Sequence, residues 1–414
     1  MEANLDTPSR SAALSSDVRR LLWVRGLRAF GDGFVSLLLP VYLLELGLTP
    51  FEVGVIATGT LLGSGALTLL VGVHAWRFRY RSLLLAATGL MIATGLGFVA
   101  FSQFWPLLVV AVVGTLNPSS GDVSVFLPLE QAMLARLVPD GRRTAMFARY
   151  SLVGALVGAI GALTAGLPEL ASRWSGVTPV AALQAMFALY ALIGVASASI
   201  YRGLPRGLAT EAEAAPAPLG RSRRFVYLLA TLFSIDAFGG GFIVQSMLAL
   251  WLFEKFQLST AVAGTIFFWT GVLSAFSYLV AVRIAGRIGL VNTMVFTHLP
   301  SSVLLILTPF VGSLAWVIVL LLARSALSQM DVPTRSSYVM AVVAPNERAA
   351  AASITSVPRS LAAATSPLLA GWLLGMSSFG APLLFAGGLK IVYDLLLLAT
   401  CRRVRPPEEA IALQ

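Results

Sequence analysis

Long apolar segments recur along the whole chain, and they restrict its fold more than any other feature. Runs such as 83–101 and 180–199 approach or reach the roughly 20 residues that a helix needs to cross a hydrocarbon core about 30 Å thick. Of the 414 residues, 57% are hydrophobic and 12% are charged, whereas soluble domains carry roughly 25% charged residues. Lipid offers no partner to backbone amides, and the runs lack the alternation of a membrane barrel. The sequence therefore predicts an all-α membrane protein.

Charge clusters and Pro/Gly turns divide the apolar sequence into twelve predicted transmembrane helices. These helices cover residues 21–44, 52–74, 82–101, 106–136, 146–167, 179–201, 225–252, 260–282, 289–311, 314–342, 353–375 and 381–400. If successive helices alternate in direction, most basic residues fall in loops on one side, which identifies that side as cytoplasmic. We therefore expect a multi-pass protein of the cytoplasmic (inner) membrane with both termini inside.

The second half of the chain repeats the first. Residues 28–35 (RAFGDGFV) match residues 236–243 (DAFGGGFI), and further matches follow in order at a nearly constant offset. Because six helices return the chain to its starting side, the copies share one orientation and form two parallel-repeat six-helix bundles. The predicted organisation is a cytoplasmic N-terminal tail at 1–20, a bundle at 21–201, a cytoplasmic linker at 202–224, a second bundle at 225–401 and a cytoplasmic tail at 402–414.

The loop after the second predicted helix carries a motif that resembles a family signature. The segment GVHAWRFRYR at 72–81 is similar to Gly-x-x-Ala-Asp-Arg-x-Gly-Arg-Arg of the major facilitator superfamily, with Gly72, Arg77 and Arg81 in matching positions. Trp76 replaces the acid of that signature, so the resemblance implies a cytoplasmic latch that is weaker or built differently here. The resemblance extends over nearly the whole chain and implies the major facilitator fold, in which helices one, four, seven and ten line a central cavity.

Ionisable side chains inside the predicted helices are the candidates for function, because each costs roughly 2.5–3.5 kcal/mol to insert at bilayer depth. The candidates for a proton or substrate path are Asp32, Asp122, Asp236, Arg324, Asp331 and Glu130. The resemblance implies that the four aspartates, in helices one, four, seven and ten, face one water-filled path. Asp32 and Asp122 are the preferred proton or substrate contacts, whereas Asp331, flanked by Arg324 and Arg335 on its helix, is expected to be structural. Glu130 is equally well explained as a gating contact.

A second group of charges has an equally good structural explanation. The possible anion or gating contacts are Arg149, Arg335, Arg359, Lys390 and Asp394. Lys390 and Asp394 are i,i+4 neighbours, so mutual neutralisation explains them as well as function does. Arg28, Arg149 and Arg335 are expected to extend to the cytoplasmic interface.

Several uncharged features also bear on the predicted path. Helix breakers at 117–121 (NPSSG) and 331–333 (DVP) lie beside the acids of helices four and ten. They predict either breaks that expose backbone groups to a site or ordinary kinks. His298 is expected to be a packing residue. Aromatic side chains of the predicted path suggest a cavity for an amphipathic or hydrophobic solute. These aromatic residues are Phe30, Phe34, Phe238, Phe242 and Trp251.

These features favour a secondary active transporter that moves a small organic solute by alternating access. The sequence has no nucleotide-binding loop, and neither a metal cluster nor a Ser/His/Asp arrangement within membrane reach, so we expect no cofactor, no metal and no enzyme activity. Its 29 basic residues are scattered, which argues against a nucleic-acid partner. We expect a monomer coupled to protons, because a buried carboxyl group can load and release a proton. The resemblance to a family that contains many drug exporters, together with the acids and aromatic residues of the predicted path, implies export of the solute.

Three alternatives to this function stay open. The first is uptake or facilitated transport of a metabolite or organic anion, with Arg324, Arg149 or Arg359 as the anion contact. The less favoured alternatives are a membrane-embedded enzyme and a non-transporting receptor. Short loops leave a receptor little surface for partners.

Overall fold

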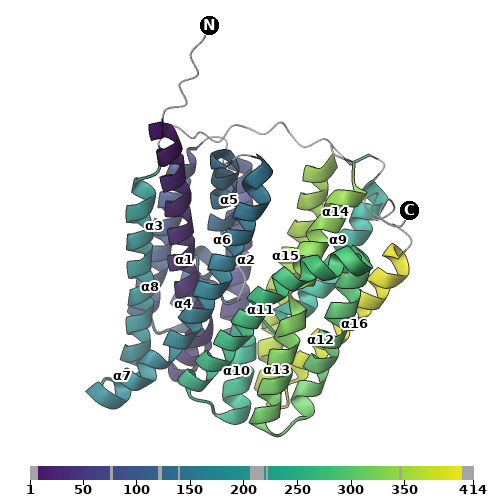
Figure 1. Cartoon of the computed structure of the whole chain (residues 1–414). Coiled ribbons are helices and arrows are strands. Elements are labelled where there is room, and N and C mark those ends of the chain that lie inside the picture. The colour runs from purple at the N-terminus through teal and green to yellow at the C-terminus, as the bar shows by residue number, and fades with distance from the viewer. Residues whose placement is uncertain are drawn as a thin grey trace.

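The computed structural model describes residues 8–74, 78–119, 124–138, 140–205, 219–220, 222–344 and 347–402. Helices joined by short connections make up this part of the chain (Figure 1). The first half contains α1 (Pro8–Glu45), α2 (Pro50–His74), α3 (Tyr80–Ala100), α4 (Phe104–Val113), α5 (Phe126–Leu137), α6 (Asp140–Leu163), η2 (Thr164–Gly166), α7 (Leu167–Ser175) and α8 (Pro179–Arg202). The second half contains α9 (Arg223–Gly241), α10 (Gln245–Phe256), α11 (Thr260–Ile288), α12 (Leu290–Leu307), η3 (Thr308–Phe310), α13 (Leu314–Ser328), α14 (Asp331–Val342), α15 (Arg348–Met376) and α16 (Ala381–Cys401).

The predicted twelve-helix arrangement is confirmed. Ten stretches of the described chain are long and apolar enough to cross a membrane. The fourth pass, which is formed by α4 and α5, and the eleventh, which is α15, complete the twelve. One boundary differs clearly from its prediction, because α1 begins at Pro8, inside the stretch assigned to the N-terminal tail.

Three passes are interrupted near the middle of the membrane. The fourth is non-helical between Val113 and Phe126 wherever the chain is described there, so the NPSSG segment forms a break and not the ordinary kink that was equally expected. In the tenth pass α13 ends at Ser328 and α14 starts at Asp331. Pro333 therefore lies in the first turn of α14, where its missing N–H breaks no helical hydrogen bond, and the interruption precedes the proline.

The interruption of the seventh pass was not predicted. Helix α9 ends at Gly241 and α10 starts at Gln245. A Cβ atom on Gly241 would overlap the carbonyl oxygen of Ala363 in α15. The glycine run of this segment thus allows close packing, as the sequence suggests, and also coincides with a break.

The two halves meet through closely packed backbones on the face away from the N-terminus (Figure 1). A Cβ on Gly371 of α15 would lie 2.5 Å from the carbonyl oxygen of Pro50 at the start of α2. About two turns from the same ends of these helices, the Leu368 N–H of α15 donates to the Thr58 hydroxyl of α2 at 2.8 Å. Between α6 and α11, a Cβ on Gly264 would lie 2.5 Å from the carbonyl oxygen of Ala162. These contacts hold the halves together at this face.

A polar contact crosses between the halves at the same face. One carboxylate oxygen of Glu169 in α7 accepts from the backbone N–H and the hydroxyl of Thr260, both at 3.2 Å, at the start of α11. The other oxygen accepts from Arg173 at 2.6 Å. A carboxylate at a helix N-terminus satisfies donors that have no partner inside the helix, so this contact favours the closed arrangement of the face.

Candidate functional site

A cavity of about 360 Å³ lies between the two halves. Its walls include segments of passes one, four, seven and ten, as the resemblance implies, together with parts of α6, α11, α12, α15 and α16. Much of the remaining lining consists of glycine, alanine and hydroxyl-bearing residues. The charged or titratable side chains among the described lining residues are Arg25, Asp32, Asp236, Tyr278, His298, Arg324, Asp331, Arg335, Arg359 and Lys390.

Asp236 of α9 is the centre of a group of buried charges on this wall. Arg335 of α14 donates through Nη1 to Asp236 Oδ2 at 2.9 Å, and Lys390 of α16 donates through Nζ to Asp236 Oδ1 at 2.7 Å. Only 4% of Asp236 is exposed. One carboxylate therefore joins three helices, and two cations offset its negative charge in a place where water is scarce.

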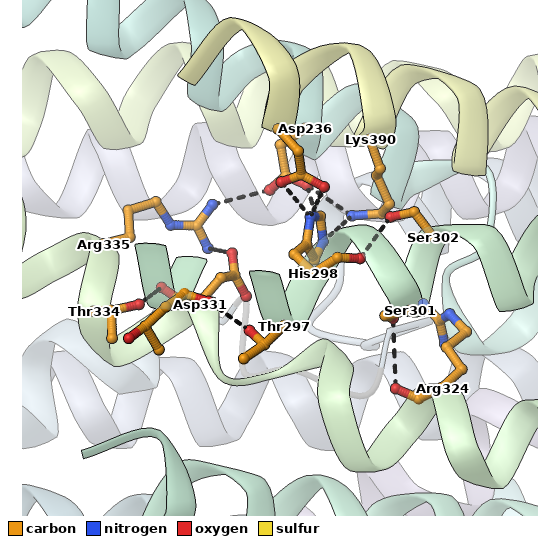
Figure 2. Close-up of polar contacts among 12 residues, drawn as sticks. Asp236, Thr297, His298, Ser301, Ser302, Arg324, Asp331, Thr334, Arg335 and Lys390 are labelled. Carbon is orange, nitrogen blue, oxygen red and sulfur yellow. Dashed lines mark hydrogen bonds and ion pairs between the residues drawn. The ribbon is translucent and has the colours of Figure 1, made fainter. Parts of the chain in front are cut away.

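The ion pairs continue on both sides of Asp236 (Figure 2). Arg335 also reaches Asp331 through Nη2, at 3.2 Å and one helical turn away. On the other side, His298 of α12 lies with Nε2 3.4 Å from Lys390 Nζ, while its Nδ1 lies 3.0 Å from Asp394 Oδ1. We call Asp236, His298, Asp331, Arg335, Lys390 and Asp394 the Asp236 network.

His298 Nε2 lies beside both Lys390 Nζ, at 3.4 Å, and Asp236 Oδ1, at 3.7 Å. If the ring is neutral, Nε2 accepts from Lys390, which carries only donors. The other nitrogen then carries the proton and donates to Asp394. A neutral histidine of this tautomer connects a lysine to a carboxylate through its two nitrogens, which is a suitable geometry for moving a proton between them.

Several interpretations of these charges are wrong. Lys390 and Asp394 are neighbours on α16, yet Lys390 bonds to Asp236 and Asp394 to His298. Arg335 does not extend to the cytoplasmic interface, since it is 7% exposed and holds two carboxylates. His298 was expected only to pack, but it also contacts Asp394 and Lys390. The apolar residues around it in the sequence give no sign of these contacts.

Glu130 lies in a separate buried group inside the first half. It is fully buried and accepts from Arg28 Nη2 at 2.5 Å and from the hydroxyls of Tyr150 and Tyr201. Arg28 is 2% exposed, so its expected extension to the interface is also wrong. Neither Arg28 nor Glu130 is among the residues that line the cavity. Since α1, α5, α6 and α8 meet here, the geometry suits a structural role.

The other candidates occupy different positions. Asp32 is half-buried and lines the cavity, while Asp122 lies outside the described residues. Arg149 is exposed on α6 and away from the cavity lining. Arg324 and Arg359 line the cavity. Arg324 does not form the expected flank of Asp331, which pairs with Arg335 instead.

The cavity is not lined by the predicted aromatic residues. Phe34 and Trp251 are fully buried, and neither they nor Phe30, Phe238 and Phe242 belong to the cavity lining. Phe267 of α11 lines it instead. The lining therefore combines charged and hydroxyl-bearing side chains with small and aliphatic ones, and it does not contain the aromatic residues from which the sequence suggested a hydrophobic solute.

Two further expectations concern the loop motif and metals. Gly72 lies near the end of α2 and Arg81 at the start of α3, and Arg77 is outside the described residues. Among the residues that the structure describes, no three His, Cys, Asp or Glu side chains form a group that could hold a metal ion.

Comparison with known proteins identifies the family and finds solved structures that share the fold. The sequence model of the Major Facilitator Superfamily matches residues 21–244 and 229–413. A relative in Saccharomyces cerevisiae, described as the uncharacterized membrane protein YJR124C, is 26% identical over 419 residues, which is 92% of this chain and 93% of the relative.

Solved structures with low sequence identity share the fold. The nucleoside transporter NupG in its D323A form has a TM-score of 0.74 and 13% identity, with 92% of this chain and 99% of that chain covered. A bacterial homolog to the human lysosomal transporter Spinster, in an inward-facing and unoccupied conformation, has a TM-score of 0.70 and 13% identity, with 95% and 98% covered. The human organic anion transporter MFSD10 has a TM-score of 0.65 and 17% identity, with 93% and 99% covered.

Proposed function

Because the chain belongs to the Major Facilitator Superfamily, we propose that it is a secondary active transporter that exchanges a small organic solute for protons across the cytoplasmic membrane. The observation that carries this proposal is the Asp236 network on the wall of a cavity between two six-helix halves. A solute in this cavity contacts both halves, so their relative rotation moves its opening from one side to the other.

The contacts between the halves support alternating access. At the closed face they consist of glycine-mediated backbone packing, the hydrogen bond from Leu368 to Thr58, and the contact of Glu169 with Thr260. Few charges need to separate when this face opens, which keeps the barrier to rotation low. Both termini are proposed to lie on the opposite, cytoplasmic side, and the working unit is proposed to be a monomer.

Proton coupling is proposed to act through Asp236. Its carboxylate holds α14 through Arg335 and α16 through Lys390. The two cations favour the ionised carboxylate, so protonation of Asp236 is coupled to release of Arg335 and Lys390, and their release would loosen α9 from these two helices. His298 and Asp394 next to Lys390 supply a route along which the proton can move.

Export is the proposed direction, on the basis of the family resemblance and of the acids that line the cavity. Asp32, Asp236 and Asp331 line it, whereas the aromatic residues that also suggested export do not. Uptake is the second candidate, favoured by Arg324 and Arg359 on the cavity wall. Membrane vesicles of known orientation distinguish the two. Export predicts that inside-out vesicles accumulate solute when their lumen is acidic, and uptake predicts accumulation in right-side-out vesicles under an inward proton gradient.

Proton movement in proteoliposomes with an enclosed pH dye tests the coupling. Added solute is expected to drive a proton flux in the wild-type protein and none in Asp236→Asn. Asp17→Asn is the control, because Asp17 pairs with Arg20 at 2.8 Å near the start of α1, away from the cavity lining. Solute movement without protons in the wild type would contradict the coupling, and an unchanged proton flux in folded Asp236→Asn would remove Asp236 from it.

A further inference from the structure

Besides Arg25 of the first half, two arginines of the second half line the cavity without belonging to the Asp236 network. Arg324 lies on α13 and Arg359 on α15. Within the described part of the chain, neither guanidinium forms an ion pair with a carboxylate, whereas Arg335 and Lys390 both do. The Nε of Arg359 is buried and has no hydrogen-bond partner among the described residues. Figure 2 shows Arg324 apart from the side chains that surround Asp236.

A guanidinium without a carboxylate in contact is unfavourable at membrane depth, and Arg324 in particular needs an explanation, because Asp236 and Asp331 attract Arg359 at longer range. Charged side chains inside a membrane protein are almost always paired or face water, and they mark substrate or ion paths. Arg335 and Lys390 already hold Asp236 and Asp331. A ligand that enters the cavity would therefore supply negative charge directly to Arg324 and add to the attraction that Arg359 experiences.

The rest of the wall near Arg324 suits a hydrophilic ligand. Ser328 and Gln329 follow it on the same pass, and Ser274 and Tyr278 of α11 lie opposite, with the Tyr278 hydroxyl donating to Gln329 at 3.2 Å. These groups offer hydroxyl and amide contacts. At about 360 Å³ the cavity is near the lower end of the roughly 300–1,000 Å³ typical of small-molecule pockets. Its size therefore favours a small metabolite over a lipid or a long peptide.

We propose that Arg324 and Arg359 form an anion site in the central cavity, and that the transported solute is a small hydrophilic organic acid held by its carboxylate or phosphate group. A guanidinium presents parallel N–H donors that match both groups, which makes arginine better suited to this task than lysine. The inference rests on the proposed transport function for its biological meaning, but it does not depend on proton coupling.

Ligand-induced stabilisation of the purified chain tests the site. Thermal unfolding is measured in detergent with pairs of probes that differ in charge: glucuronate and glucose, glycerol 3-phosphate and glycerol, and succinate and its diamide. At least one acid is expected to raise Tm while its neutral counterpart does not, because only the acid compensates the guanidinium groups. The carboxylate and phosphate pairs show which group the site prefers.

Arginine variants locate the binding. Affinity for the stabilising acid is expected to fall at least about tenfold in Arg324→Gln and in Arg359→Gln, which corresponds to about 1.4 kcal/mol each. Arg324→Lys is expected to be intermediate, since it keeps the charge and loses the planar fork. The matched control is Arg202→Gln, an exposed arginine at the end of α8 that does not line the cavity.

Three results would overturn the site: equal stabilisation by an acid and its neutral partner, unchanged binding in the Arg324→Gln/Arg359→Gln double variant, and no stabilisation by any acid. Failure of the proposed function gives a different pattern. A chain that binds the acid in detergent but carries no protons in proteoliposomes would retain the anion site and lose the coupling. Proton flux driven only by neutral solutes would support the coupling and contradict the anion site.

Discussion

Asp236 and Arg335 are 99 positions apart in the chain, and their side chains meet at 2.9 Å in the buried wall of the cavity. The contact ties α9 to α14, and the second hydrogen bond of Asp236, to Lys390, ties α9 to α16. Three helices of the second half therefore share one carboxylate. Changing the charge of this carboxylate is the most direct way for a proton to change how these helices pack.

Asp236→Asn is expected to destabilise the protein by about 3–5 kcal/mol, because it leaves Arg335 and Lys390 buried beside a neutral amide. Unfolding followed by tryptophan fluorescence in a denaturing-detergent titration measures the change. The double variant Asp236→Asn/Lys390→Met removes a charge of each sign, and it is expected to recover part of the loss. An Asp236→Asn protein as stable as the wild type would contradict the assigned ion pairs.

Glu130→Gln is expected to separate stability from transport. Glu130 accepts from Arg28, Tyr150 and Tyr201 away from the cavity, so its loss should lower the free energy of unfolding by about 3–5 kcal/mol. Proton flux per folded molecule should persist. If a folded Glu130→Gln protein carried no protons, Glu130 would belong to the proton path rather than to the scaffold of the first half.

Features set by local sequence could be predicted. The twelve passes follow from hydropathy, whereas the helix breakers beside the acids of passes four and ten left a break and an ordinary kink equally open. The interruption after Gly241 was missed because close helix packing explains a glycine run equally well. In pass ten the break precedes Pro333 because the first turn of a helix needs no N–H there.

The partners of buried charges could not be predicted, because they depend on how each helix is rotated and which helix lies beside it. Lys390 and Asp394 share a face of α16, but that face meets both α9 and α12, and each side chain reaches a different one. The depth of Arg28 was misjudged for a related reason. Its position in the chain is compatible with the interface, and only the packed structure shows Glu130 within reach.

Gly371→Val is expected to open the face at which the two halves meet, because its side chain would collide with the backbone of α2 at Pro50. The reporter is Thr58→Cys, a position bonded to Leu368 across this interface, in a Cys401→Ser background that removes the single native cysteine. Labelling by a membrane-impermeant maleimide should accelerate. Gly375→Val is the matched control, since a Cβ there meets no atom within 4 Å. Equal labelling in both variants would contradict the closed contact.

Arg324 and Arg335 lie on the same pass, and their removal is expected to have opposite consequences for the ligand-free protein. Arg335→Gln leaves Asp331 without its partner and Asp236 with one cation fewer, so unfolding should become easier by about 3–5 kcal/mol. Arg324→Gln removes a charge that no described carboxylate compensates, and the ligand-free protein should be as stable as the wild type or more stable. Unfolding of both variants without any organic acid measures this. A large loss of stability in Arg324→Gln would mean that the protein itself compensates this charge, and that the cavity needs no anionic ligand to do so.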